Sequence, residues 1–453
     1  MEMVTRKLAG FAAELRYEAL DPALILHFKK HLLDAVGCGL HGLSQPGARI
    51  VNEYLREQGG KEEATLWCQR FRGPSANVAL GLGVMIHSFD FDDYHNAKIH
   101  PGAPVIAAAV AVGEAIGASG EAVVAAMAAG YEAMIRVSLA TGPSASRLRG
   151  WHLTGTTGTF GAAAAAGNLL GLNADGMASA LGMAGTQSAG LWAFTADGAM
   201  SKRFHPGHAA QSGVMAALLA RRGFRGPTQI LEAADGGFCR ATSDRIDLSQ
   251  ITEGLGTNFH CLETNIKPYA CCASSHSAVD AVFELRTRHR LDPSDVERVR
   301  VKTAEGVRLQ CGFEYRAAGV VQAQMSLQYI VAVSLLDGAA LLEQFSEARI
   351  ADPTVMELAG RVDVVADPEM DSLYPGRYAN KVEIFLRNGK RFAARVDFPR
   401  GSVAFPMAYP EVAAKFRSLA SPVVGADRTE ALVEAIGKLE LLDDVRELTV
   451  LLS

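Results

Sequence analysis

The densest group of side chains capable of acid–base chemistry lies between residues 87 and 100. The segment HSFDFDDYHNAKIH carries three carboxylates and three imidazoles within 14 residues, and apolar helical runs flank it. Such groups either lie on an exposed loop or satisfy one another in a cleft, because an unpaired charge is costly to bury. If buried together, they would strongly shift one another's pKa values. A polar loop whose aspartates cap helices is the alternative interpretation.

Two further segments contain groups that could bind an anion. GWHLTGTTG, residues 150–158, lies just ahead of an alanine-rich run, where N–H groups and hydroxyls at a helix N-terminus would favour a carboxylate beside His152. A plain helix cap explains that segment equally well. SKRFHPGH, residues 201–208, places two cations and two imidazoles ahead of a helix expected at 209–222. A solvated basic turn is the usual meaning of such a run.

The sequence offers little support for metal, redox or nucleotide chemistry. The segment KPYACCASSH, residues 267–276, has adjacent cysteines, which lack the two-residue gap that favours zinc. The seven cysteines are an odd number and scattered, which indicates reduced, cytoplasmic thiols. The sequence contains no G-x-G-x-x-G after a strand, no G-x-x-x-x-G-K-[ST] and no G-x-S-x-G. Dehydrogenases, kinases and serine hydrolases therefore lose their usual support.

Composition is that of a globular protein large enough for two or three domains: 453 residues, 49% hydrophobic and 21% charged. A net charge of -5 provides no basic surface for nucleic acid or an anionic membrane, so neither is expected as a partner. No secretion signal is visible at the N-terminus. The longest uncharged stretch, 150–174, is rich in Gly and Thr and poor in Leu, which predicts a buried soluble segment.

Hydrophobic periodicity predicts a mainly α protein with an α+β second domain. Residues 5–234 read as helices, among them 121–140, and their many Ala and Gly residues favour close helix packing. Residues 295–303 and 381–386 alternate like strands, and an Asn-Gly turn links the latter to RFAARVDFP in a hairpin. Helices are expected at 324–336, 352–360, 410–419 and 428–438. We therefore predict a discontinuous helical domain, 1–266 and 404–453, and an α+β lid domain, 267–403.

Five segments, in this order, resemble the MmgE/PrpD family, which includes 2-methylcitrate dehydratases, cis-aconitate decarboxylases and iminodisuccinate epimerases. They are HSFDFDDYHNAKIHPGAPV, GWHLTGTTGTFGAAAAAGNLLGL, SKRFHPGHAAQSGVMAALLARRGFRGPTQILE, KPYACCASSHSAVDA and SLQYIVAVSLLDG. The resemblance covers nearly the whole chain. It implies a homodimer that needs neither cofactor nor metal, with a large helical domain, a smaller α+β lid and an active site between them.

The resemblance also implies site residues. The catalytic residues would be Asp90, Tyr94, His100, His152 and Tyr329, and the substrate-binding residues Thr154, Lys202, His205 and Lys267. We expect one imidazole, from His100 or His152, to move a proton at a carbon beside a carboxylate, with Asp90 orienting its other nitrogen. The two lysines would stabilise the enolate-like dianion that forms. Tyr94 stands where dehydratase-like and decarboxylase-like relatives commonly have Thr, which would reshape the pocket.

The predicted reaction is hydro-lyase chemistry on a small 2-hydroxy di- or tricarboxylate such as a 2-methylcitrate-like acid. Epimerisation or racemisation of a dicarboxylate amino-acid derivative is the first alternative, and decarboxylation of a cis-aconitate-like acid is the second. A metal-dependent hydrolase built on residues 87–100 is a more remote alternative, because hard cations and zinc both accept these ligand types. A non-catalytic carboxylate-binding protein is the remaining one.

Overall fold

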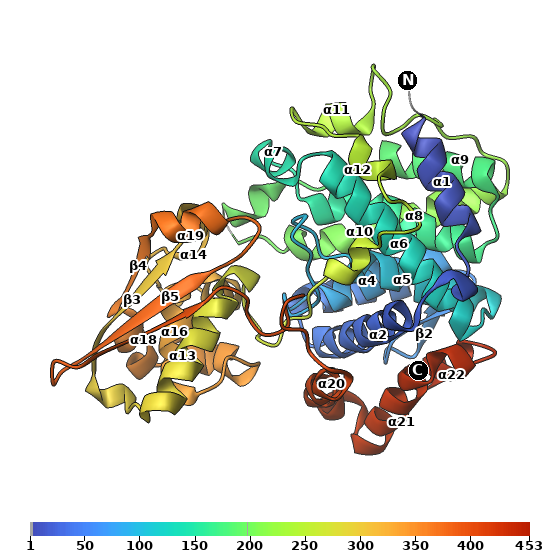
Figure 1. Ribbon diagram of the computed structural model, residues 1–453. Coiled ribbons are helices and arrows are strands. Elements are labelled where there is room, and N and C mark those ends of the chain that lie inside the picture. The colour runs from blue at the N-terminus through green and yellow to red at the C-terminus, as the bar shows by residue number, and fades with distance from the viewer. Residues whose placement is uncertain (1–2, 197) are drawn as a thin grey trace. The chain divides into compact units, whose positions relative to one another are not determined.

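A computed structural model of the protein describes residues 3–196 and 198–453, which divide into two compact units (Figure 1). The helical unit contains the chain up to Thr264 together with Ala408–Ser453. The mixed unit contains Asn265–Met407. The mainly α fold with a smaller α+β part is confirmed, because all but one short hairpin of the described strands lie in the mixed unit.

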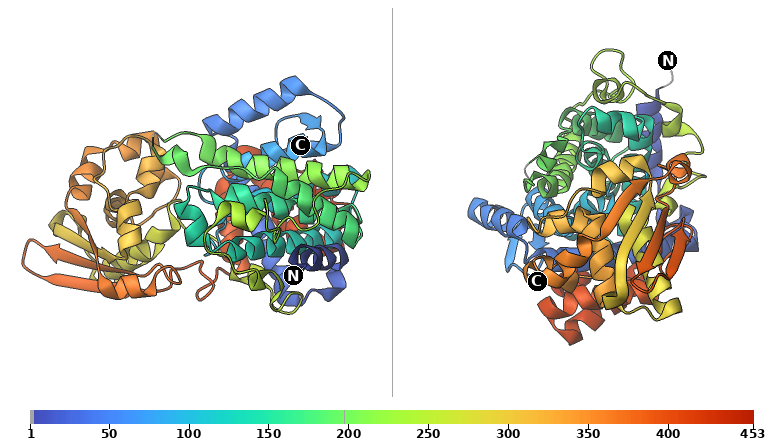
Figure 2. Two further views of the ribbon diagram at one scale, coloured as in Figure 1. Left: turned by 90° about the horizontal axis from the view of Figure 1, so that it is seen from above. Right: turned by 90° about the vertical axis from the view of Figure 1, so that its left-hand side faces the viewer.

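The helical unit is built from helices joined by both short turns and longer loops. Those of its N-terminal part are α1 Val4–Glu14, α2 Pro22–Gly42, α3 Pro46–Gln58, α4 Ser75–Ile86, α5 Gly102–Ile116, α6 Gly120–Ala140, α7 Pro143–Leu148, α8 Leu153–Leu169, α9 Ala174–Thr186, α10 Ser201–Arg221, α11 Phe238–Thr242 and α12 Ser249–Thr252. A small antiparallel hairpin, β1 Ala64–Leu66 and β2 Phe71–Gly73, lies between α3 and α4. Figure 2 shows α3 at the periphery of this unit.

Small residues let the central helices approach closely, as the alanine-rich runs predicted. A Cβ placed on Gly213 of α10 would lie 2.5 Å from Cβ of Ala162 on α8. A Cβ on Gly130 of α6 would meet Cγ1 of Val105 on α5 at the same distance. Helix α6 is long and apolar enough to cross a membrane by length and composition, but 89% of its apolar window is buried inside the protein. It is therefore a core helix.

Two helices begin earlier than the sequence suggested. Helix α8 begins at Leu153, so the Gly and Thr residues up to 158 form its first turns instead of preceding it. Helix α10 begins at Ser201 instead of near 209, so the basic segment is helical and Pro206 lies in its second turn. Packing outweighs the proline there, because Gly207 is pressed against α4, where a Cβ would lie 2.4 Å from the Leu80 carbonyl oxygen.

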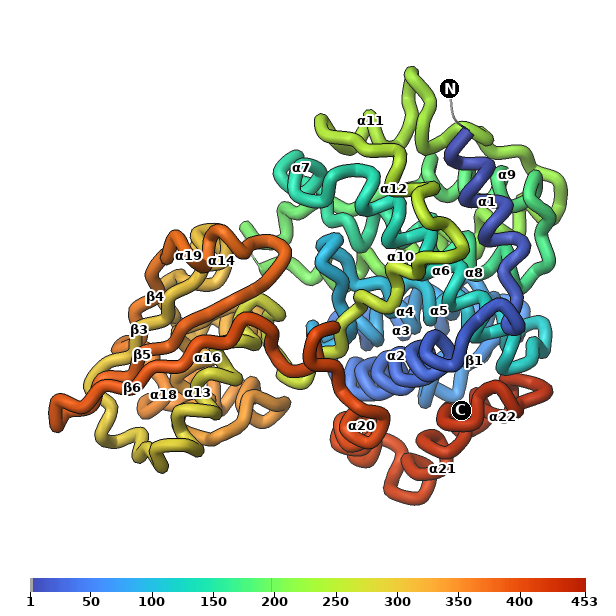
Figure 3. Tube along the Cα trace, in the orientation of Figure 1, coloured from blue at the N-terminus to red at the C-terminus, as the bar shows by residue number. Residues whose placement is uncertain are grey.

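The C-terminal tail returns to the helical unit, as Figure 3 shows in red beside the blue N-terminal helices. Its helices are α20 Tyr409–Val424, α21 Ala426–Gly437 and α22 Arg446–Val450. Helix α20 packs on α2, where a Cβ on Gly37 would lie 3.0 Å from the ring of Phe416 and 3.3 Å from Leu419. The tail helices expected at 410–419 and 428–438 are confirmed.

The mixed unit is a four-stranded sheet with helices packed against it. Its elements are α13 His276–His289, β3 Val296–Thr303, α14 Glu305–Cys311, α15 Val320–Met325, α16 Leu327–Asp337, α17 Glu347–Ile350, α18 Pro353–Ala359, β4 Val362–Ala366, α19 Pro368–Leu373, β5 Asn380–Leu386 and β6 Arg391–Val396. The strand order is β4-β3-β5-β6, and only the β3–β4 pair is parallel. Helix α13 packs on β5 and β6, and α16 on β4.

The hairpin predicted from the Asn-Gly turn is confirmed. Strands β5 and β6 pair antiparallel, with Lys381 opposite Arg395, and Gly389 in the turn has φ of 81°. The helix expected at 324–336 is interrupted at Ser326, whose hydroxyl accepts a hydrogen bond from the Tyr329 backbone N–H at 3.3 Å. Strand β4 was not predicted from the sequence.

Candidate active site

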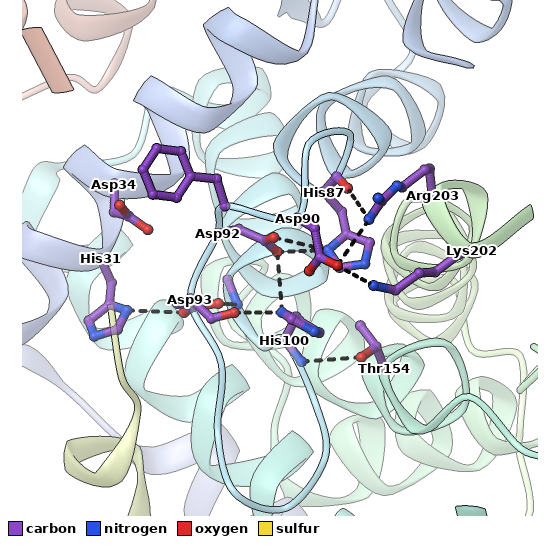
Figure 4. A network of polar contacts seen from close by, with 12 residues as sticks. His31, Asp34, His87, Asp90, Asp92, Asp93, His100, Thr154, Lys202 and Arg203 are labelled. Carbon is purple, nitrogen blue, oxygen red and sulfur yellow. Dashed lines mark hydrogen bonds and ion pairs between the residues drawn. The ribbon is translucent and has the colours of Figure 1, made fainter. Parts of the chain in front are cut away.

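The polar segment between α4 and α5 is folded inward, and its side chains satisfy one another (Figure 4). His87 follows the last residue of α4, and its Nδ1 lies 2.8 Å from Asp92 Oδ2. Both side chains are at most 1% exposed. The alternative of a solvent-exposed capping loop is therefore wrong for this part of the segment.

His100 is fixed by the same segment and by α8. Its Nδ1 lies 2.7 Å from the Asp93 carbonyl oxygen, which can only accept, so Nδ1 donates the hydrogen bond. Its backbone N–H donates to the Thr154 hydroxyl at 3.1 Å. A neutral His100 therefore carries its proton on Nδ1 and its lone pair on Nε2, which is the atom suited to take up a proton. Its side chain is 17% exposed, more than that of His87.

Asp93 fastens the segment to the helices beneath it. Its Oδ2 lies 3.0 Å from His31 Nδ1 and accepts a hydrogen bond from the Tyr131 hydroxyl at 2.8 Å, and its Oδ1 accepts one from the Gly102 backbone N–H at 2.9 Å. Burial and the neighbouring Asp92 raise the pKa of Asp93 to about 7, although the hydrogen bonds from Tyr131 and Gly102 oppose the rise. Burial also lowers the pKa of His31 to about 3, so His31 is neutral near pH 7.

Helix α10 contributes two cationic side chains, Lys202 and Arg203, to the site. Lys202 Nζ lies 2.7 Å from Asp90 Oδ2, and Arg203 lies 3.7 Å from the same oxygen. The Lys202 side chain is 15% exposed. Asp90 has φ of 59°, in the left-handed region that few non-glycine residues adopt. This turn directs its carboxylate toward α10, whereas Asp92 faces the imidazoles.

His152 immediately precedes α8, and its Nδ1 lies 2.9 Å from Nδ1 of His205 on α10. One of the two Nδ1 atoms must donate, so in the neutral pair one histidine carries its proton on Nδ1 and the other carries its proton on Nε2. The rings of Trp192 and Phe194 pack edge-on against His152, each with a centroid separation of 5.4 Å. Burial, followed by the charge of Lys202, holds the pKa of His152 well below its usual 6.5. His152 is therefore neutral near pH 7.

The predicted residues of the helical unit gather in one cluster. The ring centroids of His87 and His100 are 4.6 Å apart, and those of His87 and His152 are 6.3 Å apart. Hydrogen bonds add Thr154 and His205 to this group. The cluster's predicted members are Asp90, His100, His152, Thr154, Lys202 and His205. Tyr94 lies buried in the same loop.

Two predicted residues belong to the mixed unit. Lys267 is 1% exposed and lies just after that unit begins. Tyr329 on α16 has a fully buried ring next to Tyr315 and Phe345, and its hydroxyl donates to the Gln344 carbonyl oxygen. Burial raises the pKa of Tyr329. Their roles in catalysis stay predictions.

Several residues of the cluster were not assigned a role from the sequence. Asp92 holds His87 and the Asp93 carbonyl holds His100, and neither contact was assigned from the sequence; the orienting role expected of Asp90 stays a prediction. The density of acids in residues 90–93 was a usable signal for both. His31 and Tyr131 lie on apolar helices and look like ordinary core residues in the sequence.

The cluster also contains groups that could hold a metal ion. One ligand atom each from His87, Asp92 and His100 lies within 4.8 Å of the other two, and two imidazoles with one carboxylate are ligands that zinc accepts. In the contacts observed, Nδ1 of each histidine faces an oxygen of the loop, so Nε2 would have to bind the ion. The same geometry also suits metal-free proton transfer.

Comparison with known proteins places the chain among enzymes of one family. The family models for the MmgE/PrpD N-terminal domain and the MmgE/PrpD C-terminal domain match residues 6–250 and 269–441. The chain is 30% identical to a cis-aconitate decarboxylase of Aspergillus terreus, over 99% of this chain and 96% of that protein. It is 28% identical to a cis-aconitate decarboxylase of Homo sapiens, over 100% of this chain and 95% of that protein. It is 25% identical to a 2-methylcitrate dehydratase of Cupriavidus necator, over 85% of this chain and 83% of that protein.

Proposed function

Because the chain belongs to the MmgE/PrpD family, we propose that it is a lyase that forms a carbanion beside a carboxylate of a small polycarboxylic acid. The observation that supports this most directly is the gathering of His100, His152 and Lys202 in one largely buried cluster. A multiply charged anion needs fixed cations, and a carbanion needs an adjacent acid–base group. This cluster supplies both.

Lys202 is the proposed electrostatic anchor. Its ammonium is held 2.7 Å from Asp90, so its position is set before a substrate arrives. A dianionic, enolate-like carboxylate carries more charge than the starting carboxylate, so a fixed ammonium beside it favours the transition state over the ground state. Arg203 lies 3.7 Å from the same Asp90 oxygen and offsets part of its negative charge.

His100 is the proposed proton-transfer residue. Its tautomer is set by the Asp93 carbonyl, and its ring is more exposed than that of His152, which is 2% exposed. His152 is the proposed hydrogen-bond partner of a substrate carboxylate, because its ring is held by His205 and between two aromatic side chains. Bound carboxylates would raise the pKa of either imidazole and so allow it to become cationic during the reaction.

Decarboxylation of a cis-aconitate-like acid is the reaction we now place first. The two decarboxylases match over nearly their whole length, whereas the dehydratase matches at lower identity and coverage. In this reaction the C–C bond to one carboxylate breaks, carbon dioxide leaves, and the electron pair spreads through the double bond onto another carboxylate. His100 then gives a proton to the carbon beside that carboxylate. Dehydration of a 2-methylcitrate-like acid, the second candidate, would use the same groups in the opposite sense to remove such a proton.

The test is to incubate the purified protein with cis-aconitate and with 2-methylcitrate in deuterium oxide and to follow each by NMR. Release of carbon dioxide with deuterium in a methylene dicarboxylate product supports decarboxylation. A new alkene without carbon dioxide supports dehydration. Deuterium uptake into an unchanged dicarboxylate amino-acid derivative, tried in parallel, supports epimerisation. Absence of turnover and of exchange with every polycarboxylate tried would contradict the proposed function.

We further propose that two copies assemble and that the protein works in the cytoplasm. Two apolar pairs support the assembly: Ile50 and Tyr54 on α3 are 59% and 54% exposed, and Met200 and Phe204 at the start of α10 are 55% and 40% exposed. A Cβ on Gly47 in the first turn of α3 would lie 3.9 Å from Met200 Sδ, so Met200 lies beside the start of the helix that carries the first pair. Light scattering should give twice the chain mass, and a monomeric wild-type protein would contradict the proposal. Seven free cysteines support the location.

A further inference from the structure

Four consecutive residues of the site loop each turn toward a different neighbour. Asp90 faces Lys202 on α10, and Asp92 faces His87 and, at 3.8 Å, His100. Asp93 faces His31 and Tyr131 beneath the loop. The residue between the first two acids, Phe91, is 2% exposed and faces the C-terminal tail. Phe91 therefore lies within the short segment from which the three carboxylates diverge.

Lys415 of α20 contacts both the backbone and the ring of Phe91. Its ammonium donates to the Phe91 carbonyl oxygen at 2.7 Å and lies 3.8 Å from the centroid of the Phe91 ring. The same ammonium lies 2.6 Å from Asp34 Oδ1 on α2. The Lys415 and Asp34 side chains are 5% and 1% exposed. Lys415, which is more than 320 positions from Phe91 in the sequence, thus contacts the Phe91 backbone, the Phe91 ring and the buried Asp34.

The charges around the loop give this contact an electrostatic role as well. Burial, with smaller contributions from Asp93 and Asp92, raises the pKa of Asp34 to about 6, although Lys415 opposes the rise. Lys415 also acts against the raised pKa of Asp93. Several carboxyl groups therefore lie near this ammonium in a region with little water, where charge–charge interactions are weakly screened.

We propose that Lys415 is a positioning residue of the active site: by fixing Phe91 it holds Asp90 toward Lys202 and Asp92 toward the imidazoles. This inference rests on the proposed function. Attachment of the tail does not depend on Lys415 alone, because Phe416 and Leu419 pack on Gly37 of α2. Replacing a buried ion pair with apolar residues of similar volume is often tolerated, whereas removing one partner is not. The double variant Lys415→Met/Asp34→Leu therefore separates positioning from stability.

The double variant should fold with a thermal midpoint near that of the wild type, and its kcat should fall about 10- to 100-fold, because small misplacements of catalytic groups cost factors of this size. KM should change less, because Lys202, the proposed anchor of the substrate, is carried by α10 and not by the loop. Lys29→Met is the matched comparison. Lys29 on α2 is equally buried, 8% exposed, and it likewise links α2 to the tail, through Glu440 and, at 2.9 Å, the Gly437 carbonyl oxygen. We expect its kcat to stay within twofold of the wild type.

A folded double variant whose kcat lies within threefold of the wild type would overturn the inference, as would an equal loss in Lys29→Met. If the double variant does not fold, Lys415→Met/Asp34→Asn, which keeps a polar group at position 34, takes its place with the same expectations. Crystal structures give a readout that does not need turnover. In the double variant, the Asp92 carboxylate should leave hydrogen-bonding distance of His87 Nδ1, and an unchanged loop contradicts the inference. A wild-type protein that transforms no polycarboxylate instead refutes the proposed function, and the crystal structures then decide on Lys415 alone.

Discussion

Replacing Lys202 with methionine should lower kcat/KM by about 10- to 1,000-fold. The substitution keeps the length of the side chain and removes the ammonium that lies 2.7 Å from Asp90. A charge-assisted hydrogen bond to a substrate carboxylate is worth about 1.5 to 3 kcal/mol, and two unit charges about 4 Å apart near a protein surface interact with about 4 kcal/mol. At about 1.4 kcal/mol for each factor of ten, these energies give the range stated.

The assay is steady-state decarboxylation of cis-aconitate, with carbon dioxide release and product formation both measured. Arg221→Met is the matched variant, because it removes one cation from the other end of the same helix, at an exposed position. It should keep kcat/KM within about twofold, whereas Lys202→Met should lose at least tenfold with an unchanged circular dichroism spectrum. A folded Lys202→Met protein within threefold of the wild type would refute the anchoring role.

Three further predictions concern Asp93, its neighbour Gly102 and metal binding by the cluster. Because the pKa of Asp93 rises from 3.8 to about 7 on folding, its contribution to stability is complete below pH 4 and is lost as pH rises through 7. The contribution of Asp93 to the free energy of unfolding that is lost in this way is on the order of 4 kcal/mol. Urea unfolding should therefore show wild-type stability falling relative to Asp93→Asn between pH 4 and 7, and parallel pH curves would exclude the buried, protonated carboxyl. Gly102→Ala should cost about 1 to 3 kcal/mol of stability and at least tenfold in kcat, because its Cβ would lie 2.9 Å from both Asp93 carboxylate oxygens; wild-type kinetics would show that Asp93 can move freely. Activity should survive a chelator, and metal analysis of the active protein should find no stoichiometric ion at His87, Asp92 and His100; loss of activity restored by zinc would assign the cluster to a metal instead.

Much of the fold was accessible from the sequence because its signals are local. Alternation and an Asn-Gly turn identified the β5–β6 hairpin, and apolar periodicity with many small residues identified the packed helices. The start of α10 was not predictable in this way. Its first turns contain Pro206 and two cations, and the helix forms there because Gly207 packs closely on α4.

The site was predictable where residue types stand close together in the chain. Residues 87–100 stand out by their density of acids and imidazoles. The segments that contain His152 and Lys202 gave weaker signals, and the family resemblance assigned these two residues their roles. Which neighbour each carboxylate of residues 90–93 faces was not predictable, because it depends on a left-handed backbone conformation at Asp90. Lys415 was not predictable either, since nothing in a solvent-facing helix pattern distinguishes a lysine that turns inward to an acid on α2.

His100 is the residue proposed to move a proton at a carbon beside a substrate carboxylate. The most direct measurement is the deuterium content of the product formed from cis-aconitate in deuterium oxide, read by NMR at each carbon. We predict one deuteron per turnover on the carbon beside a carboxylate, on a single face, and loss of this turnover in His100→Gln. A product without deuterium at that carbon, or an unchanged rate in His100→Gln, would contradict the claim.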